Sequence, residues 1–183
     1  MNKKRIYLLS GFILVAAFSR IIPHPYNFAP IGAMSIFGAA YFSDKRLSLM
    51  LPLVAMFISD LLVNNILYAS FYEGFVWVSP GFWSVYGAIA LIVLAGWFIL
   101  KKVNTKTVIA GSLSASIIFF LVTNFGVWLS SPTYPLTFGG LMTSYTMAIP
   151  FFHFTVLGDL FYSGVLFGAF EFVKSRNTVF QQG

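Results

Sequence analysis

Six apolar segments dominate the sequence and restrict the chain to folds that a lipid bilayer can hold. A helix needs about 20 apolar residues to cross the hydrocarbon core, with a range of about 17–25. The segments are residues 6–22, 31–43, 47–63, 81–100, 107–130 and 151–173. The sequence therefore predicts an all-α polytopic membrane protein with six transmembrane helices in a single domain, residues 1–174, followed by a polar cytoplasmic tail at 175–183.

The composition agrees with a membrane protein. Hydrophobic residues make up 58% of the 183-residue chain and charged residues only 9%, whereas about a quarter of the residues of a soluble domain are charged. There is no cysteine, which excludes disulfides, cysteine-ligated zinc and thiol nucleophiles.

Basic residues divide unequally between the loops and so predict the orientation. With the N-terminus inside, ten of the eleven lie on the cytoplasmic face and only Arg20 lies outside, as the positive-inside rule expects. The ten are Lys3, Lys4, Arg5, Lys45, Arg46, Lys101, Lys102, Lys106, Lys174 and Arg176. Both termini are therefore expected in the cytoplasm. The clusters act as topology signals, so the net charge of +6 does not indicate nucleic-acid binding. We interpret residues 6–22 as an uncleaved first span rather than a signal peptide.

Two stretches on the outer side are irregular. Residues 64–80 are apolar and aromatic, and residues 131–150 combine prolines and glycines with a short apolar piece. Neither is long enough to span the membrane, and a seventh span would carry the basic C-terminal cluster outside. We interpret both as interfacial or re-entrant segments over the outer mouth of the protein.

Polar side chains within the spans are few and lie towards the outer side. Burying them in hydrocarbon is costly, so each is a candidate for function. The candidate substrate-binding residues are Asp159, Asn124, Trp128, Asp60, Arg20, Asn27 and His153. The inner half of the spans has little comparable polarity. This asymmetry predicts a cavity that opens outward and is closed inward by apolar packing.

Each candidate also has a structural interpretation. Arg20 and Asp60 could bind solute, or could form an ion pair that only fixes helix packing. Asp159 has no basic neighbour in sequence and is the strongest functional candidate. Trp128 shares a helix face with Asn124 and could stack on a flat ring, whereas His153 fits a histidine at the membrane interface.

The glycines of the last span could mark a close helix contact. Gly164 and Gly168 form a small-xxx-small pair, and we expect it to serve packing inside this chain rather than with a partner.

Motifs for enzymatic chemistry are absent from the sequence. It contains no P-loop, dinucleotide-binding fingerprint, His-Glu-x-x-His or Gly-x-Ser-x-Gly motif. His24, His153 and an aspartate have no metal-site spacing. We therefore expect neither a cofactor nor a metal, and no enzymatic activity.

Several motifs resemble a family of uncharacterised bacterial integral membrane proteins, a domain of unknown function. They are Arg20, residues 27–33 (Asn-Phe-Ala-Pro-Ile-Gly-Ala), Phe37-Gly38, residues 52–60, Thr123-Asn124-Phe125 with Trp128, and Pro150-Phe151-Phe152. More remotely, the layout is similar to the substrate-binding S components of energy-coupling-factor vitamin transporters. That resemblance implies six helices, both ends inside and a vitamin-like solute held near the outer face under loops. The first helix of such components often carries an Ala-x-x-x-Ala motif that contacts the energising module. This chain lacks the motif, since Arg20 lies four residues after Ala16.

These observations predict a solute-binding subunit for uptake in the bacterial cytoplasmic (inner) membrane. It would capture a small neutral or cationic, vitamin-like compound from the outer side. Its expected partners are the solute, the lipid bilayer and a membrane energising module or other membrane subunits. The alternative is a structural or assembly subunit of a larger membrane complex. A third possibility is a membrane-embedded enzyme that uses His153 with Asp159 or Asp60 as acid and base.

Overall fold

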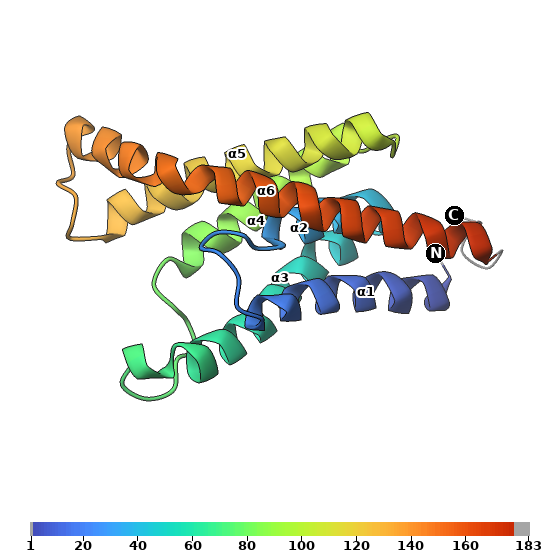
Figure 1. The fold of residues 1–183 in the computed structure, drawn as a ribbon, viewed down its shortest axis with the longest axis horizontal. Helices are drawn as coiled ribbons and strands as arrows, with labels where there is room; N and C mark the ends of the chain where they lie inside the picture. The colour runs from blue at the N-terminus through green and yellow to red at the C-terminus, as the bar shows by residue number, and fades with distance from the viewer. Residues whose placement is uncertain (1, 178–183) are drawn as a thin grey trace.

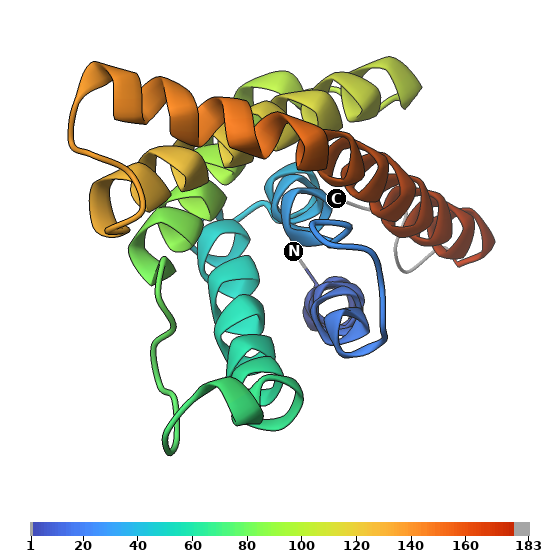
Figure 2. The same cartoon turned by 60° about the vertical axis from the view of Figure 1, so that its left-hand side comes forward.

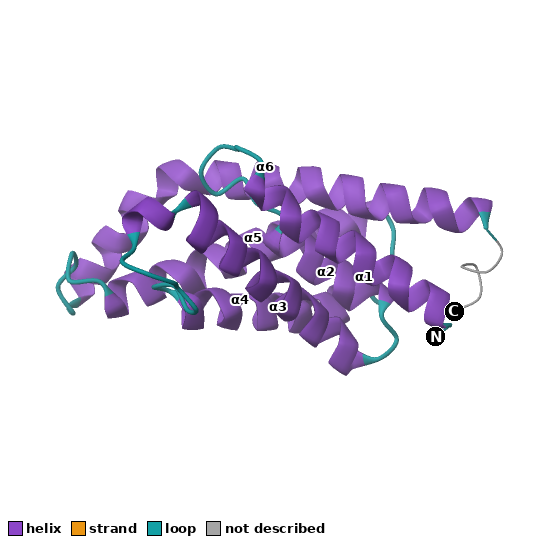
Figure 3. Cartoon of the chain, turned by 90° about the horizontal axis from the view of Figure 1, so that it is seen from below, coloured by secondary structure: helices purple, strands orange, loops and turns teal. Residues whose placement is uncertain are grey.

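The computed structural model describes residues 2–177, and every regular element in this range is helical (Figures 1 and 3). The α-helices are α1 (Lys3–Phe18), α2 (Ile31–Tyr41), α3 (Lys45–Leu62), α4 (Phe82–Ile99), α5 (Thr105–Ser130) and α6 (Phe138–Arg176). Shorter elements are η1 (Ser19–Ile21), the π-helical continuation of α3, η2 (Val63–Leu67), and η3 (Ala69–Phe71). The expected all-α fold is confirmed.

Four of the described helices are long and apolar enough to cross a membrane: α3 with η2, α4, α5 and α6. The chain is therefore a membrane protein. Helix α1 has 16 residues, about 24 Å at 1.5 Å per residue, which is shorter than the hydrocarbon core of about 30 Å. The count of six spans and the cytoplasmic location of the termini stay predictions.

The basic clusters gather at one end of the bundle. Helices α1, α3 and α5 begin there and α4 and α6 end there, so the chain runs back and forth along the long axis (Figure 1). We call this the basic end and the opposite one the far end. Asparagine or aspartate caps start three of these helices: Asn2, Asp44 and Asn104 each accept a bond from a first-turn backbone N–H.

Helix α2 lies at the centre of the bundle and is encircled by the other five α-helices of the described residues (Figure 2). Nine of its 11 residues are buried. Its length is about 16 Å, half of the hydrocarbon core, so the helix within residues 31–43 is shorter than a full span. The chain instead returns into the bundle through residues 22–30, and α2 begins part-way along it.

The start of the last helix differs from the expectation. Residues 138–150 are helical and continuous with the expected span 151–173, so the interfacial or re-entrant interpretation of 131–150 holds at most for the loop 131–137. Thr137 caps the start by accepting a bond from Gly140 N, 3.2 Å away. Pro150 lies inside the helix. A proline removes one backbone hydrogen bond from a helix, and neighbouring helices in a membrane protein can compensate for that loss.

Helical structure extends into residues 175–176 and into the stretch 64–80. Ser175 and Arg176 belong to α6 rather than to a tail, and residues 178–183 of the expected tail lie outside the described residues. Residues 64–80 form η2, η3 and an irregular return. Asn65 ties this return together, since its side chain donates to Val76 O and accepts from Val76 N at 2.9 and 2.7 Å.

Glycines let the neighbouring helices approach α2 closely, and one of them gives a test of its central position. A Cβ on Gly96 of α4 would lie 2.7 Å from Ala39 Cβ, whereas a Cβ on Gly87 of the same helix meets nothing within 4 Å. We expect Gly96→Ala to destabilise the protein by about 1–3 kcal/mol through overpacking. Gly87→Ala is the matched control, because both changes gain the same helix propensity. Thermal unfolding of both variants in detergent, followed by tryptophan fluorescence, measures the difference. Equal unfolding temperatures would contradict the close α2–α4 contact.

Candidate functional site

A cavity of about 410 Å³ lies in the far half of the bundle between α4, α5 and α6, beside the loop 22–30. We call it the far cavity. Its polar lining residues are Asn27, Thr123, Asn124, Tyr134, Ser144 and Thr155. Four phenylalanines, Phe119, Phe120, Phe151 and Phe152, supply flat apolar walls. Among the described residues that line this cavity, none is charged.

The loop 22–30 brings Asn27 into the lining of the far cavity. Asn27 adopts a left-handed conformation with φ of 64°, which asparagine tolerates better than most residues. Phe28 and Ala29 then press on Gly158 of α6, where a Cβ would lie 3.0 Å from Ala29 N and 3.1 Å from Phe28 Cα. Any larger residue at 158 would push the loop away. The glycine therefore fixes the loop that carries Asn27.

Asn124 projects from α5 and is half-buried. Its Nδ2 donates to Phe120 O, one turn back, at 2.8 Å. One of its two N–H groups is thus satisfied within its own helix. Its Oδ1 forms no hydrogen bond with the described residues and can accept one from a bound molecule. Thr123 is satisfied in the same way, with its hydroxyl donating to Phe119 O at 2.7 Å.

Asp159 does not line the far cavity; it closes the start of α2. Its Oδ1 accepts a bond from Ala33 N at 3.2 Å, and its Oδ2 accepts one from the Ser116 hydroxyl at 2.7 Å. The side chain is only 2% exposed. Pro30 occupies the N-cap position of α2 and makes no side-chain cap. The carboxylate of α6 therefore caps α2 from a distance and lies at the positive end of the helix dipole.

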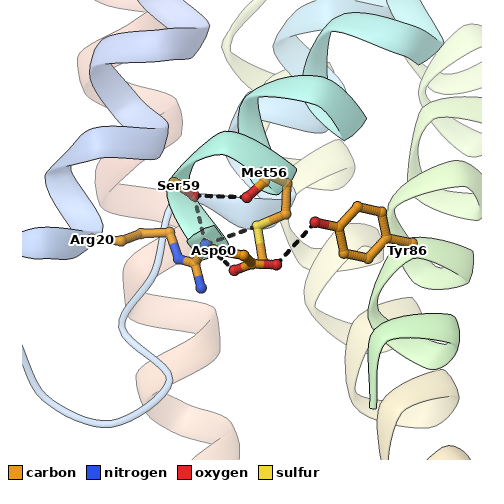
Figure 4. A network of polar contacts seen from close by, with 5 residues as sticks. All are labelled: Arg20, Met56, Ser59, Asp60 and Tyr86. Carbon is orange, nitrogen blue, oxygen red and sulfur yellow. Dashed lines mark hydrogen bonds and ion pairs between the residues drawn. The ribbon is translucent and has the colours of Figure 1, made fainter. Parts of the chain in front are cut away.

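Arg20 and Asp60 form an ion pair, at 2.7 Å, between the end of α1 and α3 (Figure 4). The same guanidinium nitrogen also donates to Ser59 Oγ at 2.7 Å and to Met56 Sδ at 3.1 Å. The second carboxylate oxygen of Asp60 accepts from the Tyr86 hydroxyl of α4, at 2.9 Å. Of the two interpretations left open, the geometry fits the packing pair, because this network joins α1, α3 and α4 and is absent from the far-cavity lining.

The two remaining candidates also lie off the far cavity. Trp128 donates from Nε1 to Pro135 O at 3.0 Å and so ties the end of α5 to the loop before α6. His153 is exposed, with its ring beside Phe154. Among the described residues, His153 is not a hydrogen-bond partner of Asp159 or of Asp60. Of the seven candidates, the structure brings Asn27 and Asn124 together at the far cavity, pairs Arg20 with Asp60 elsewhere, and leaves Asp159, Trp128 and His153 outside the lining.

Some of the cavity residues were not anticipated from the sequence. Tyr134 and Ser144 come from the stretch 131–150, which the sequence predicts to be an interfacial or re-entrant segment, and Ser144 donates to Asn124 O at 3.1 Å. The capping threonine at 137 was the available signal that a helix begins there. The phenylalanines carried no signal, because aromatic residues are frequent throughout the chain. Within residues 2–177 no group of three or more histidine and acidic residues could hold a metal ion.

Comparison with protein families gives one match, which covers nearly the whole chain. The model of a family described as "Family of unknown function (DUF6580)" matches residues 1–180. Comparisons with curated proteins and with solved structures found no match.

Proposed function

Since the chain belongs to this family of unknown function, its role must be inferred from its own geometry, and we propose that it is a solute-binding membrane subunit for uptake. The far cavity carries the proposal. Its volume of about 410 Å³ lies within the range of roughly 300–1,000 Å³ that is usual for small-molecule sites. Apolar walls with a few polar groups are also typical of such sites.

The lining chemistry favours a neutral compound with a flat ring. Phenylalanine rings offer faces for stacking, and Asn27 and Asn124 offer amides to orient a polar edge. A charged solute would lose its hydration without meeting an opposite charge, since the charged groups Arg20, Asp60 and Asp159 lie outside the lining. We therefore narrow the expected solute from neutral or cationic to neutral.

The charge distribution supports uptake rather than export. If the basic end faces the cytoplasm, as the positive-inside rule predicts, the far cavity is on the outer side of a bacterial cytoplasmic membrane. Capture from outside then needs a source of energy. A membrane energising module is the partner that this proposal names, and no catalytic step is part of the role.

Mass spectrometry of small molecules retained by the gently purified protein tests the proposal. We expect a neutral ring compound to accompany the wild-type protein. Asn124→Leu removes the accepting oxygen at similar size, and Ala148→Phe fills part of the cavity. Each variant should weaken binding of the retained compound at least tenfold, which corresponds to about 1.4 kcal/mol.

A matched threonine pair controls for effects on the helices. Thr123 lines the far cavity and Thr146 does not, and each hydroxyl donates to the backbone oxygen four residues earlier. Thr123→Val should reduce retention, whereas Thr146→Val should leave it unchanged. A wild-type protein that carries no compound, and instead purifies with stoichiometric partner proteins, would refute the proposal in favour of an assembly subunit.

A further inference from the structure

A second cavity, of about 700 Å³, opens at the basic end between α5 and α6. We call it the basic-end cavity. Asn104, Glu171 and Lys174 line its mouth, and Ser112 and Ser163 lie at its deep end, joined by a hydroxyl–hydroxyl bond of 2.8 Å. Polar groups thus continue from the charged mouth into the middle of the bundle.

Gly164 and Gly168 line this same cavity. A Cβ on either glycine meets nothing within 4 Å, and both residues are exposed. The expectation that this pair serves packing inside the chain is therefore wrong for the described residues. The small residues leave one wall of the basic-end cavity open instead.

Both cavities lie on the seam between α5 and α6, and only a thin layer separates them. On α5 the deepest lining residues are Ser112 and Phe119; on α6 they are Leu160 and Thr155. At 1.5 Å per residue, the layer is about 10 Å thick along α5 and about 8 Å along α6. It contains Ser116 and Asp159, which bond each other.

We propose that the two cavities are the halves of one solute pathway, with the contact between Asp159 and the start of α2 as its closed gate. The inference rests on the proposed function and extends it, because the chain would then both capture the solute and pass it along its own α5–α6 seam. Polar side chains on both sides of Asp159 support this. Ser112 and Ser163 lie on the basic-end side, and Thr155, Asn27 and Asn124 lie on the far side.

Few contacts hold the gate closed. Asp159 accepts one bond from Ala33 N and one from Ser116, and Gly158 supports Phe28 and Ala29 by close approach. A displacement of α6 relative to α2 and α5 breaks all of them together. Pro150 provides a place in α6 where the helix can bend, since its backbone ladder is interrupted there.

The chain contains no cysteine, so single introduced cysteines can report which side of the membrane reaches each cavity. Gly164→Cys probes the basic-end cavity and Thr155→Cys the far cavity. Leu157→Cys is the matched control on the same helix, because Leu157 is exposed on the bundle surface and lines neither cavity. The probe is a membrane-impermeant cationic methanethiosulfonate, applied to sealed vesicles of either orientation.

We expect Gly164→Cys to react only from the basic face, Thr155→Cys only from the opposite face, and Leu157→Cys from neither. A cysteine at 164 as unreactive as the one at 157 would mean that lipid or protein fills the groove, and would overturn the pathway. If the wild-type protein still retains a compound that depends on Asn124, the proposed function survives that failure.

Weakening the gate gives the second half of the test. In Thr155→Cys protein, Asp159→Ala should make the cysteine react from the basic face as well, at a rate at least ten times the background measured with Asp159 intact, provided that the variant stays folded. Ser116→Ala removes one hydroxyl at little steric cost and serves where Asp159→Ala does not fold. If neither substitution makes position 155 reactive from the basic face, the gate does not lie at Asp159.

Discussion

Replacing Asp159 with alanine is expected to lower the free energy of unfolding by about 2–4 kcal/mol. The change removes the acceptor for Ala33 N and for the Ser116 hydroxyl. A buried donor left unsatisfied costs about 1–3 kcal/mol, and loss of a helix cap costs about 1 kcal/mol. Asp159→Asn retains one acceptor oxygen and should cost less. Unfolding by heat or by denaturing detergent, monitored by tryptophan fluorescence, compares the three proteins.

Gly32 makes this prediction specific to the contact with α2. A Cβ on Gly32 would lie 2.5 Å from Asp159 Oδ1 and 2.7 Å from Asp159 Cγ. Gly32→Ala alone should therefore destabilise the protein, and much less so when Asp159 is already alanine. The coupling energy between adjacent sites of this kind is about 0.5–3 kcal/mol. Additive losses would show that the two residues do not touch. If Asp159→Ala protein is as stable as the wild type but no longer retains its compound, the capping role is wrong and Asp159 binds the solute.

Breaking the Arg20–Asp60 pair on one side only is expected to cost about 2–4 kcal/mol. Each side chain is 14% exposed, so removing either partner leaves a mostly buried charge without its counter-ion. Asp60→Leu also leaves the Tyr86 hydroxyl without its acceptor. The double variant Arg20→Met/Asp60→Leu removes both charges and should lose less stability than either single variant. Unfolding free energies of all four proteins complete the cycle.

The ion pair between Lys174 and Glu171 provides the control. It is 3.1 Å long, but its side chains are 31% and 46% exposed, and exposed pairs contribute about 0–1 kcal/mol. Lys174→Met should therefore change stability little. If Asp60→Leu is equally harmless while solute retention falls, the packing role is wrong and Asp60 belongs to a binding site.

The helical class could be predicted from local information, but the expectation of a bundle closed by apolar packing at the basic end is wrong, because the basic-end cavity opens there and carries polar groups. Long apolar runs specify helices in a bilayer, and Asn27 and Asn124 are two of the seven polar candidates that the sequence places towards the outer side. The role of Asp159 could not be predicted, because its partner Ala33 is 126 residues away in sequence. Nothing near Asp159 indicates that it caps another helix.

Three expectations differ from the structure because a local signal can have two meanings. The sixth span is expected to begin at residue 151, yet α6 begins at Phe138. Residues 31–43 were apolar enough to suggest a span, yet their helix is only 11 residues long. Trp128 was expected to face a solute, but its indole N–H finds Pro135 O in the following loop. For Trp128, a contact in the following loop decides the outcome.

The capping of α2 by α6 has a consequence for how the protein is made. Ribosomal synthesis delivers α2 well before α6, and α2 is too short to span the bilayer alone. Until α6 arrives, the first backbone N–H groups of α2 have no acceptor, and such groups are costly inside lipid. Correct placement of the second helix thus depends on the last one. A nascent chain truncated before Asp159 should keep residues 31–41 accessible to protease or hydrogen exchange, and extension past it should bury them.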